Sequence, residues 1–130
     1  MTKVMVFGTF DILHEGHLNF FKQARAYGDE LVCVIARNIN VNRNKGRYPE
    51  KDEKVRLANI VESGAVDVAR LGYLEEPYKI IYEERPDVIC LGYDQHSYDA
   101  NLAATFPDIQ IVRLKPYKPE IYKTSLLRKK

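Results

Sequence analysis

Five short apolar runs recur along the chain, and longer polar or amphipathic stretches separate them. The runs are rich in valine and isoleucine, and most are continuous rather than alternating with polar residues. They occupy residues 4–8, 31–36, 66–71, 88–92 and 109–114. Continuous apolar runs of this length are typical of strands in a parallel sheet whose two faces are both covered.

The first stretch between these runs predicts a helix over about residues 16–27. Leu18, Phe21 and Ala24 recur there at helical spacing, so they are expected to share the inner face of the helix. Gly28 follows directly and is a natural place for a helix to stop.

Four further helices are predicted along the rest of the chain. They lie at about residues 50–63, 77–85, 101–106 and 124–130. In the first of these, Val55, Ala58 and either Ile60 or Val61 are expected to face inward. The preceding segment, residues 37–49, is polar and rich in asparagine. It predicts a long loop, and long loops in compact domains often carry function.

Strands that alternate with helices predict a doubly wound α/β domain with a parallel sheet. Ligands of such domains bind outside the carboxyl ends of the strands, at the point where the strand order reverses. The 130 residues fit one core of ordinary size, so a single domain over residues 1–130 is expected.

The strand-to-helix junction at residues 7–17 contains the most unusual polar residues of the chain. His14 and His17 stand at the mouth of the first helix, and their spacing places them on one helix face. Free N–H groups at a helix N-terminus favour anions, especially phosphate. Gly16 between the histidines allows a ligand to approach the backbone closely. The junction therefore predicts a phosphate-handling site with two imidazole donors.

Composition and charge narrow the possible partners. Hydrophobic residues make up 45% of the chain and charged residues 29%, as in a globular protein. The net charge of +2 is too small to indicate a nucleic-acid partner. No apolar run reaches membrane-spanning length and the N-terminus has no signal-peptide pattern, so no membrane partner and a cytoplasmic location are expected.

The two cysteines, Cys33 and Cys90, each lie inside an apolar run. They are expected to be buried, reduced thiols that pack as small hydrophobic residues. No Cys/His spacing typical of a metal site is present, so no metal-ligating residues are predicted.

The junction also resembles a known signature. Its motif reads Gly8-Thr9-Phe10-Asp11, followed by His14-x-Gly16-His17. This pattern is similar to that of the HxGH nucleotidyltransferase (cytidylyltransferase-like) superfamily, in particular to the glycerol-3-phosphate cytidylyltransferases and the archaeal-type FAD synthases. The resemblance implies a Rossmann-like five-stranded sheet with the order 3-2-1-4-5. The ligand crevice would then lie between strands one and four, where residues 8–11 and 92–95 meet.

The resemblance also implies a reaction. A nucleoside monophosphate is transferred from a nucleoside triphosphate to the phosphate of a small acceptor, and pyrophosphate is released. Because a phosphate monoester is already a competent nucleophile, catalysis reduces to positioning and to stabilisation of charge. A Mg²⁺ ion bound mainly by the phosphates would assist. The family is usually homodimeric, and a homodimer is expected here.

Site residues follow from the resemblance position by position. The expected catalytic residues are His14, His17, Lys45 and Arg56. The expected nucleotide-binding residues are Gly8, Thr9, Phe10, Gly16, Gly92, Asp94, Thr124 and Ser125. Asp11 is expected to bind the acceptor or to orient its own loop, and an Asx turn is its simpler interpretation. Arg43 and Arg47 compete with Lys45 for the phosphate contact.

Four interpretations of the function stay open at this point. ATP with FMN is favoured by the segment Tyr93-Asp94-Gln95 and by the absence of the Arg-Thr-x-Gly element of the cytidylyltransferases. CTP with glycerol 3-phosphate is favoured by the compact length. Another activated sugar or alcohol phosphate is the third possibility. A regulatory module that binds nucleotide without turnover is the fourth, because Lys123 replaces the first hydroxyl residue of the family's C-terminal motif.

Overall fold

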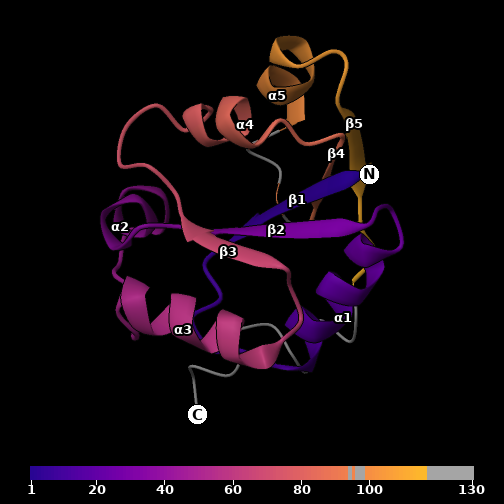
Figure 1. The fold of residues 1–130 in the computed structure, drawn as a ribbon. Helices are drawn as coiled ribbons and strands as arrows, with labels where there is room; N and C mark the ends of the chain where they lie inside the picture. Colours follow the sequence, from indigo (N-terminus) through magenta and orange to yellow (C-terminus); the bar gives the residue numbers. More distant parts are fainter. Residues whose placement is uncertain (94, 96–98, 117–130) are drawn as a thin grey trace.

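The computed structural model describes residues 1–93, 95 and 99–116. Their strands form one parallel sheet with the order β3-β2-β1-β4-β5, seen in Figure 1. The strands are β1 (Lys3–Gly8), β2 (Glu30–Ile35), β3 (Val68–Leu71), β4 (Val88–Leu91) and β5 (Gln110–Arg113). All four strand pairs are parallel. The predicted α/β Rossmann-like fold and its strand order are confirmed.

Helices cover both faces of this sheet. They are α1 (Glu15–Arg25), α2 (Asn38–Lys45), α3 (Glu53–Ser63), α4 (Lys79–Glu84) and α5 (Asp99–Thr105). Buried residues of α1 and α3 pack in one hydrophobic cluster, and those of α4 and of the α5 region pack in another. In Figure 1, α1 and α3 accordingly lie below the sheet and α4 and α5 above it. The predicted helix over residues 124–130 lies outside the described residues.

The continuous apolar runs are explained by this two-sided burial. In β1, Val4 and Val6 face the cluster of α1 and α3, whereas Met5 and Phe7 face that of α4. All four side chains are at most 7% exposed. A strand with both faces buried has no position for a polar residue, so the alternation of an open sheet is lost. Cys33 and Cys90 lie in this interior as free thiols.

The inner faces of two helices differ from their predicted positions. Val55, Ala58 and Val61 of α3 are exposed, and Ile60 is buried together with Arg56. The arginine occupies the inward position because protein acceptors surround its guanidinium, as described below. Leu18 of α1 is also exposed, since the inner face begins with the His17 ring, which packs against Phe10.

The predicted loop over residues 37–49 is wrong for most of its length, because residues 38–45 form α2. The carboxylate of Glu53 accepts hydrogen bonds from the Asn38 backbone N–H at 2.9 Å and from Arg37 Nε at 2.8 Å. Gly46 ends the helix in the left-handed conformation, with φ +75°. Asparagine disfavours helix, so this helix depends on a cap supplied from another helix.

No helix in the described part of the chain is long and apolar enough to cross a membrane.

Candidate active site

A cavity of about 950 Å³ opens where the carboxyl ends of β1, β2 and β4 meet. The junction at residues 7–17, helix α2 and the segment from Gly72 to Pro77 form most of its wall. Among the predicted site residues, those that line it are Gly8, Thr9, Phe10, Asp11, His14, Gly16, His17, Lys45 and Gly92. Asp94, Thr124 and Ser125 lie outside the described residues, and Arg56 is not among the described residues of the wall.

The two histidines form a stacked pair at the start of α1. Their ring centroids lie 3.9 Å apart with an interplanar angle of 23°. His14 Nδ1 accepts a hydrogen bond from the Gly16 N–H at 3.0 Å, and His17 Nδ1 accepts one from the His14 N–H at 3.3 Å. A neutral imidazole whose Nδ1 accepts carries its proton on Nε2. Both rings therefore offer an Nε2–H donor.

The surroundings keep both imidazoles neutral near pH 7. Burial, together with charge repulsion from the nearby His14 and Lys45, lowers the pKa of His17 from 6.5 to about 3. Burial also lowers the pKa of His14. Neutral rings with fixed tautomers act as oriented hydrogen-bond donors, and proton uptake is not needed for that role.

The low pKa of His17 predicts a pH dependence of stability. The unfolded chain protonates this ring below pH 6.5, whereas the folded chain keeps it neutral down to about pH 3. The unfolded state thus binds more protons in this window, and stability is lost as the pH falls through it. Between pH 7 and pH 5, the free energy of unfolding should fall by about 2 kcal/mol more in the native chain than in His17→Asn. Denaturant titrations at both pH values measure this, and equal losses would contradict it.

Phe10 and Gly8 shape the floor beside the histidines. The Phe10 ring is 5% exposed and meets the His17 ring edge-on, with centroids 5.2 Å apart. A Cβ atom on Gly8 would lie 2.5 Å from Phe10 Cζ, so only glycine leaves room for this ring. Phe10 itself has a positive φ of 53°. The two residues thus hold the turn that presents His17.

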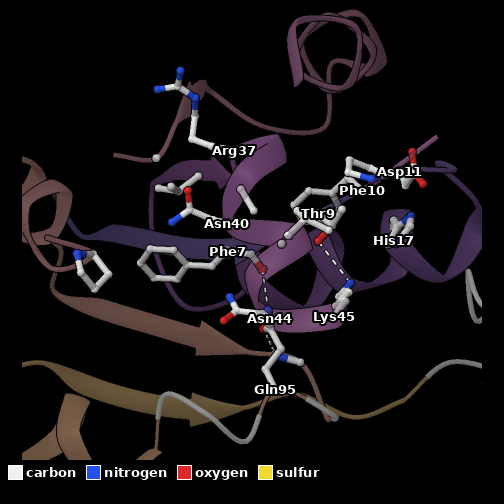
Figure 2. A pocket seen from close by; sticks show the side chains of 18 of the residues that line it. Phe7, Thr9, Phe10, Asp11, His17, Arg37, Asn40, Asn44, Lys45 and Gln95 are labelled. Carbon is white, nitrogen blue, oxygen red and sulfur yellow. Dashed lines mark hydrogen bonds between the residues drawn. The ribbon is translucent and has the colours of Figure 1, made fainter. Parts of the chain in front are cut away.

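Lys45 reaches the site from the last turn of α2. Its Nζ donates to Thr9 Oγ1 at 3.3 Å, a contact that Figure 2 draws across the cavity. Arg43 and Arg47, its predicted competitors, also line the cavity, and Arg43 forms an exposed ion pair with Glu75 at 3.7 Å. Of these three basic residues, Lys45 is the one with an observed contact to a motif residue, Thr9.

Arg56 and Asp11 hold the junction from behind. The Arg56 side chain is fully buried and donates to Thr9 O at 2.9 Å, to Lys51 O at 3.0 Å and to Asn38 Oδ1 at 2.8 Å. Asp11 is 3% exposed, and its carboxylate accepts the backbone N–H groups of Glu50 and Lys51, each at 2.9 Å. These bonds tie the junction to the residues before α3. The carboxylate of Asp11 thus bonds to residues far along the chain, whereas in an Asx turn it would bond to the backbone of its own loop.

Several cavity residues were not among the predicted site residues. Gln95 bridges two strand ends, because its Nε2 donates to Phe7 O at 2.9 Å and its Oε1 accepts the Gly92 N–H at 2.7 Å. Asn40 and Asn44 line the wall from α2, and so does Arg37, the N-cap residue of that helix. These residues and Lys45 recur at helical spacing, which could have indicated that they share one face of a helix. The spacing indicates a shared face only in a helix, and this segment was predicted to be a loop.

Among the described residues, no group of three or more histidine, cysteine, aspartate or glutamate side chains gathers as metal ligands do.

Sequence comparisons agree with this geometry. The Cytidylyltransferase-like family matches residues 5–130. FAD synthase from Thermoplasma volcanium is 42% identical over all of this chain and 94% of its own length. FAD synthase from Methanothrix thermoacetophila is 45% identical over 74% of this chain and 66% of its own length.

Solved structures extend the comparison. A Thermoplasma volcanium protein described as a lipopolysaccharide core biosynthesis protein superposes with a TM-score of 0.84 at 43% identity. The match covers 91% of this chain and 99% of that one. Pantothenate synthetase from Thermus thermophilus shares the fold alone, with a TM-score of 0.63 at 15% identity over 88% of this chain and 55% of its own. The chain therefore belongs to the cytidylyltransferase-like family and is a nucleotidyltransferase.

Proposed function

We propose that the protein transfers AMP from ATP to the phosphate of FMN and so forms FAD and pyrophosphate. The reaction type is supported by one observation above all, the stacked pair of neutral imidazoles, with Lys45 near enough to His17 for its charge to lower the pKa of that ring. The nucleotide and the acceptor are supported by the similarity to proteins named FAD synthase, three of which are aligned over 94% of their own length.

In the proposed step, a phosphate oxygen of the acceptor attacks the α-phosphorus of the triphosphate. A new P–O bond forms, the bond from the α-phosphorus to the bridging oxygen breaks, and pyrophosphate leaves with that electron pair. His14 and His17 donate from Nε2 to the phosphate oxygens on which charge accumulates, and Lys45 binds charge that the triphosphate carries before and during the step. Mg²⁺ bound to the triphosphate would supply further neutralisation. No side chain has to take up a proton.

Other residues prepare the site without touching the reacting atoms. The Arg56 and Asp11 contacts fix the turn that carries Thr9 and Phe10, and the Gly16 N–H orients the His14 ring through its bond to His14 Nδ1. The predicted nucleotide contacts of Gly92, Asp94, Thr124 and Ser125 belong to the same proposal. So do a homodimeric state, a cytoplasmic location, a single domain over residues 1–130, and the absence of nucleic-acid and membrane partners.

Pyrophosphate release with Mg²⁺ tests the proposal, with ATP and CTP each offered with FMN and with glycerol 3-phosphate. We expect release only with ATP and FMN, together with FAD identified by chromatography. Release with CTP and glycerol 3-phosphate would favour the cytidylyl reaction. Nucleotide binding without release from any pair would favour the regulatory module.

Replacing Lys45 with alanine should raise the KM for ATP about tenfold to a hundredfold, because one charge-assisted hydrogen bond is lost. The change in kcat should be smaller. Steady-state kinetics at fixed FMN measure both constants. Arg43→Ala and Arg47→Ala serve as matched comparisons, since they remove a charge from the same wall of the cavity. A larger rise of KM in either of them would assign the phosphate contact to that arginine.

A further inference from the structure

The cavity continues past the histidines to the opposite face of the sheet. There its wall is mainly apolar, and we call this part the apolar lobe. It is formed by Phe7, Val34, Val41, Leu74, Pro77 and Ile80. Phe7, Val34 and Ile80 belong to the hydrophobic cluster of α4, whereas Phe10 belongs to that of α1 and α3. In Figure 2, Phe7 and Asn40 lie on one side of the cavity and His17 on the other.

The two ends of the cavity differ in charge, and this difference orients a charged ligand. The N-terminus of α1 and Lys45 make the histidine end favourable to phosphate. Beside the apolar lobe, Glu75 and Glu76 line the wall together with Arg43, whose charge is offset by its ion pair with Glu75 at 3.7 Å, so this end has no excess of positive charge. An acceptor therefore enters with its phosphate toward the histidines and its uncharged part in the apolar lobe.

One polar group of the apolar lobe has an unmet hydrogen-bonding requirement. Asn40 Oδ1 is buried and has no hydrogen-bond partner among residues 1–93, 95 and 99–116. The other half of the same amide makes one long bond, from Nδ2 to Leu74 O at 3.3 Å. An acceptor atom left in this state destabilises the empty site, and a ligand N–H group that reaches it removes the penalty. Rotation of the Asn40 side chain into the cavity breaks only that long bond.

We propose that the apolar lobe holds the flat ring system of the acceptor and that Asn40 recognises its imide edge. In the bound state, Asn40 Oδ1 accepts from the ring N–H and Nδ2 donates to the adjacent ring carbonyl. A carboxamide and an imide present matching donor and acceptor pairs. This inference rests on the proposed function, with FMN as the acceptor, and it makes Asn40 the residue that determines acceptor specificity.

The apolar lobe distinguishes between classes of acceptor. A planar heteroaromatic ring buries its faces against Phe7, Leu74 and Pro77 and gains from their removal from water. A polyol such as glycerol would place hydroxyl groups against the same carbon atoms without partners, which is unfavourable. Adenine also offers a donor–acceptor edge that an asparagine could recognise. Asn40, however, follows β2, which lies on the other side of β1 from the crevice between β1 and β4. The nucleotide is expected in that crevice.

Flavin fluorescence titration in the presence of a non-hydrolysable ATP analogue tests the inference. The ligands are FMN and 3-methyl-FMN, in which a methyl group replaces the imide hydrogen. The native chain should bind 3-methyl-FMN about threefold to tenfold more weakly than FMN. Asn40→Ala should bind both with nearly equal affinity. Asn42→Ala, on the same helix but outside the cavity wall, should keep the discrimination of the native chain. Thermal unfolding confirms that each variant is folded.

The outcomes separate the two proposals. If FMN is adenylylated but Asn40→Ala discriminates as well as the native chain, the role of Asn40 is refuted and the proposed function stands. If Asn40→Ala instead loses its preference for ATP over ITP, which lacks the amino group of adenine, Asn40 belongs to the base site and the inference is overturned. If FMN neither binds nor reacts, the proposed function fails and the inference fails with it.

Discussion

Replacing His17 with alanine is expected to lower kcat by about 10²–10³-fold, the usual effect of losing one preorganised donor to a developing charge. The Nε2–H of His17 is oriented by the bond from the His14 N–H to its Nδ1 and by the Phe10 ring against its edge. Alanine removes the donor and offers no substitute. The KM values for both substrates should change much less, because the donor acts mainly on charge that develops in the transition state.

Steady-state assays of pyrophosphate release measure this effect, and a parallel unfolding titration reports on the fold. The free energy of unfolding should fall by about 1 kcal/mol, the usual consequence of losing a helix-capping partner. Lys22→Ala changes an exposed residue of the same helix and should leave kcat within a factor of two or so. If His17→Ala keeps a rate near that of the native chain, His17 has no catalytic role.

Replacing Arg56 with methionine is expected to lower the free energy of unfolding by about 3–5 kcal/mol. The substitution removes a buried guanidinium and leaves three partly buried acceptors, Thr9 O, Lys51 O and Asn38 Oδ1, without their donor. Each unsatisfied buried acceptor costs about 1–3 kcal/mol, and removing one member of a buried charged network has effects of this total size. Because a domain is stable by only about 5–15 kcal/mol, the effect is large.

Denaturant titration at pH 7 measures this loss, with Lys54→Met as the matched control. Lys54 is an exposed residue of the same helix, and its replacement should change the free energy of unfolding by at most about 0.5 kcal/mol. The experiment also separates two roles for Arg56. An arginine that reached the phosphates, as the resemblance implied, would lose activity on substitution with little loss of stability. The observed contacts predict instead that the loss of stability is the main effect and that activity is lost only as a consequence of it.

The sequence was most informative where structure follows from local pattern. Continuous apolar runs are sufficient to identify strands that are buried on both faces, and the His14–His17 spacing is sufficient to place two imidazoles at one helix start. Helix α2 could not be predicted in this way. Its first N–H group is capped by Glu53, fifteen residues further along the chain, and no local signal in an asparagine-rich segment reveals such a partner.

The same limit applies to the supporting part of the site. Arg56 donates to Thr9 across 47 positions of the chain, and Gln95 donates to Phe7 across 88. A resemblance can indicate that an arginine in α3 matters, but only the folded arrangement distinguishes a phosphate ligand from a residue that holds the loop. The environment of His17, and with it the neutral state of its ring, depends likewise on burial that the sequence does not contain.

Helix α2 also sets a fixed distance. Asn40 and Lys45 stand on one short helix, so their separation along its axis is roughly 7.5 Å, at 1.5 Å per residue. The helix therefore fixes the spacing between the contact that Asn40 makes and the contact that Lys45 makes with a ligand bound along it. Deleting one residue between them would rotate one side chain by about 100° relative to the other. A substitution at position 40 or 45 therefore changes one contact at a time. A change in the length of the helix between them would disturb both contacts together.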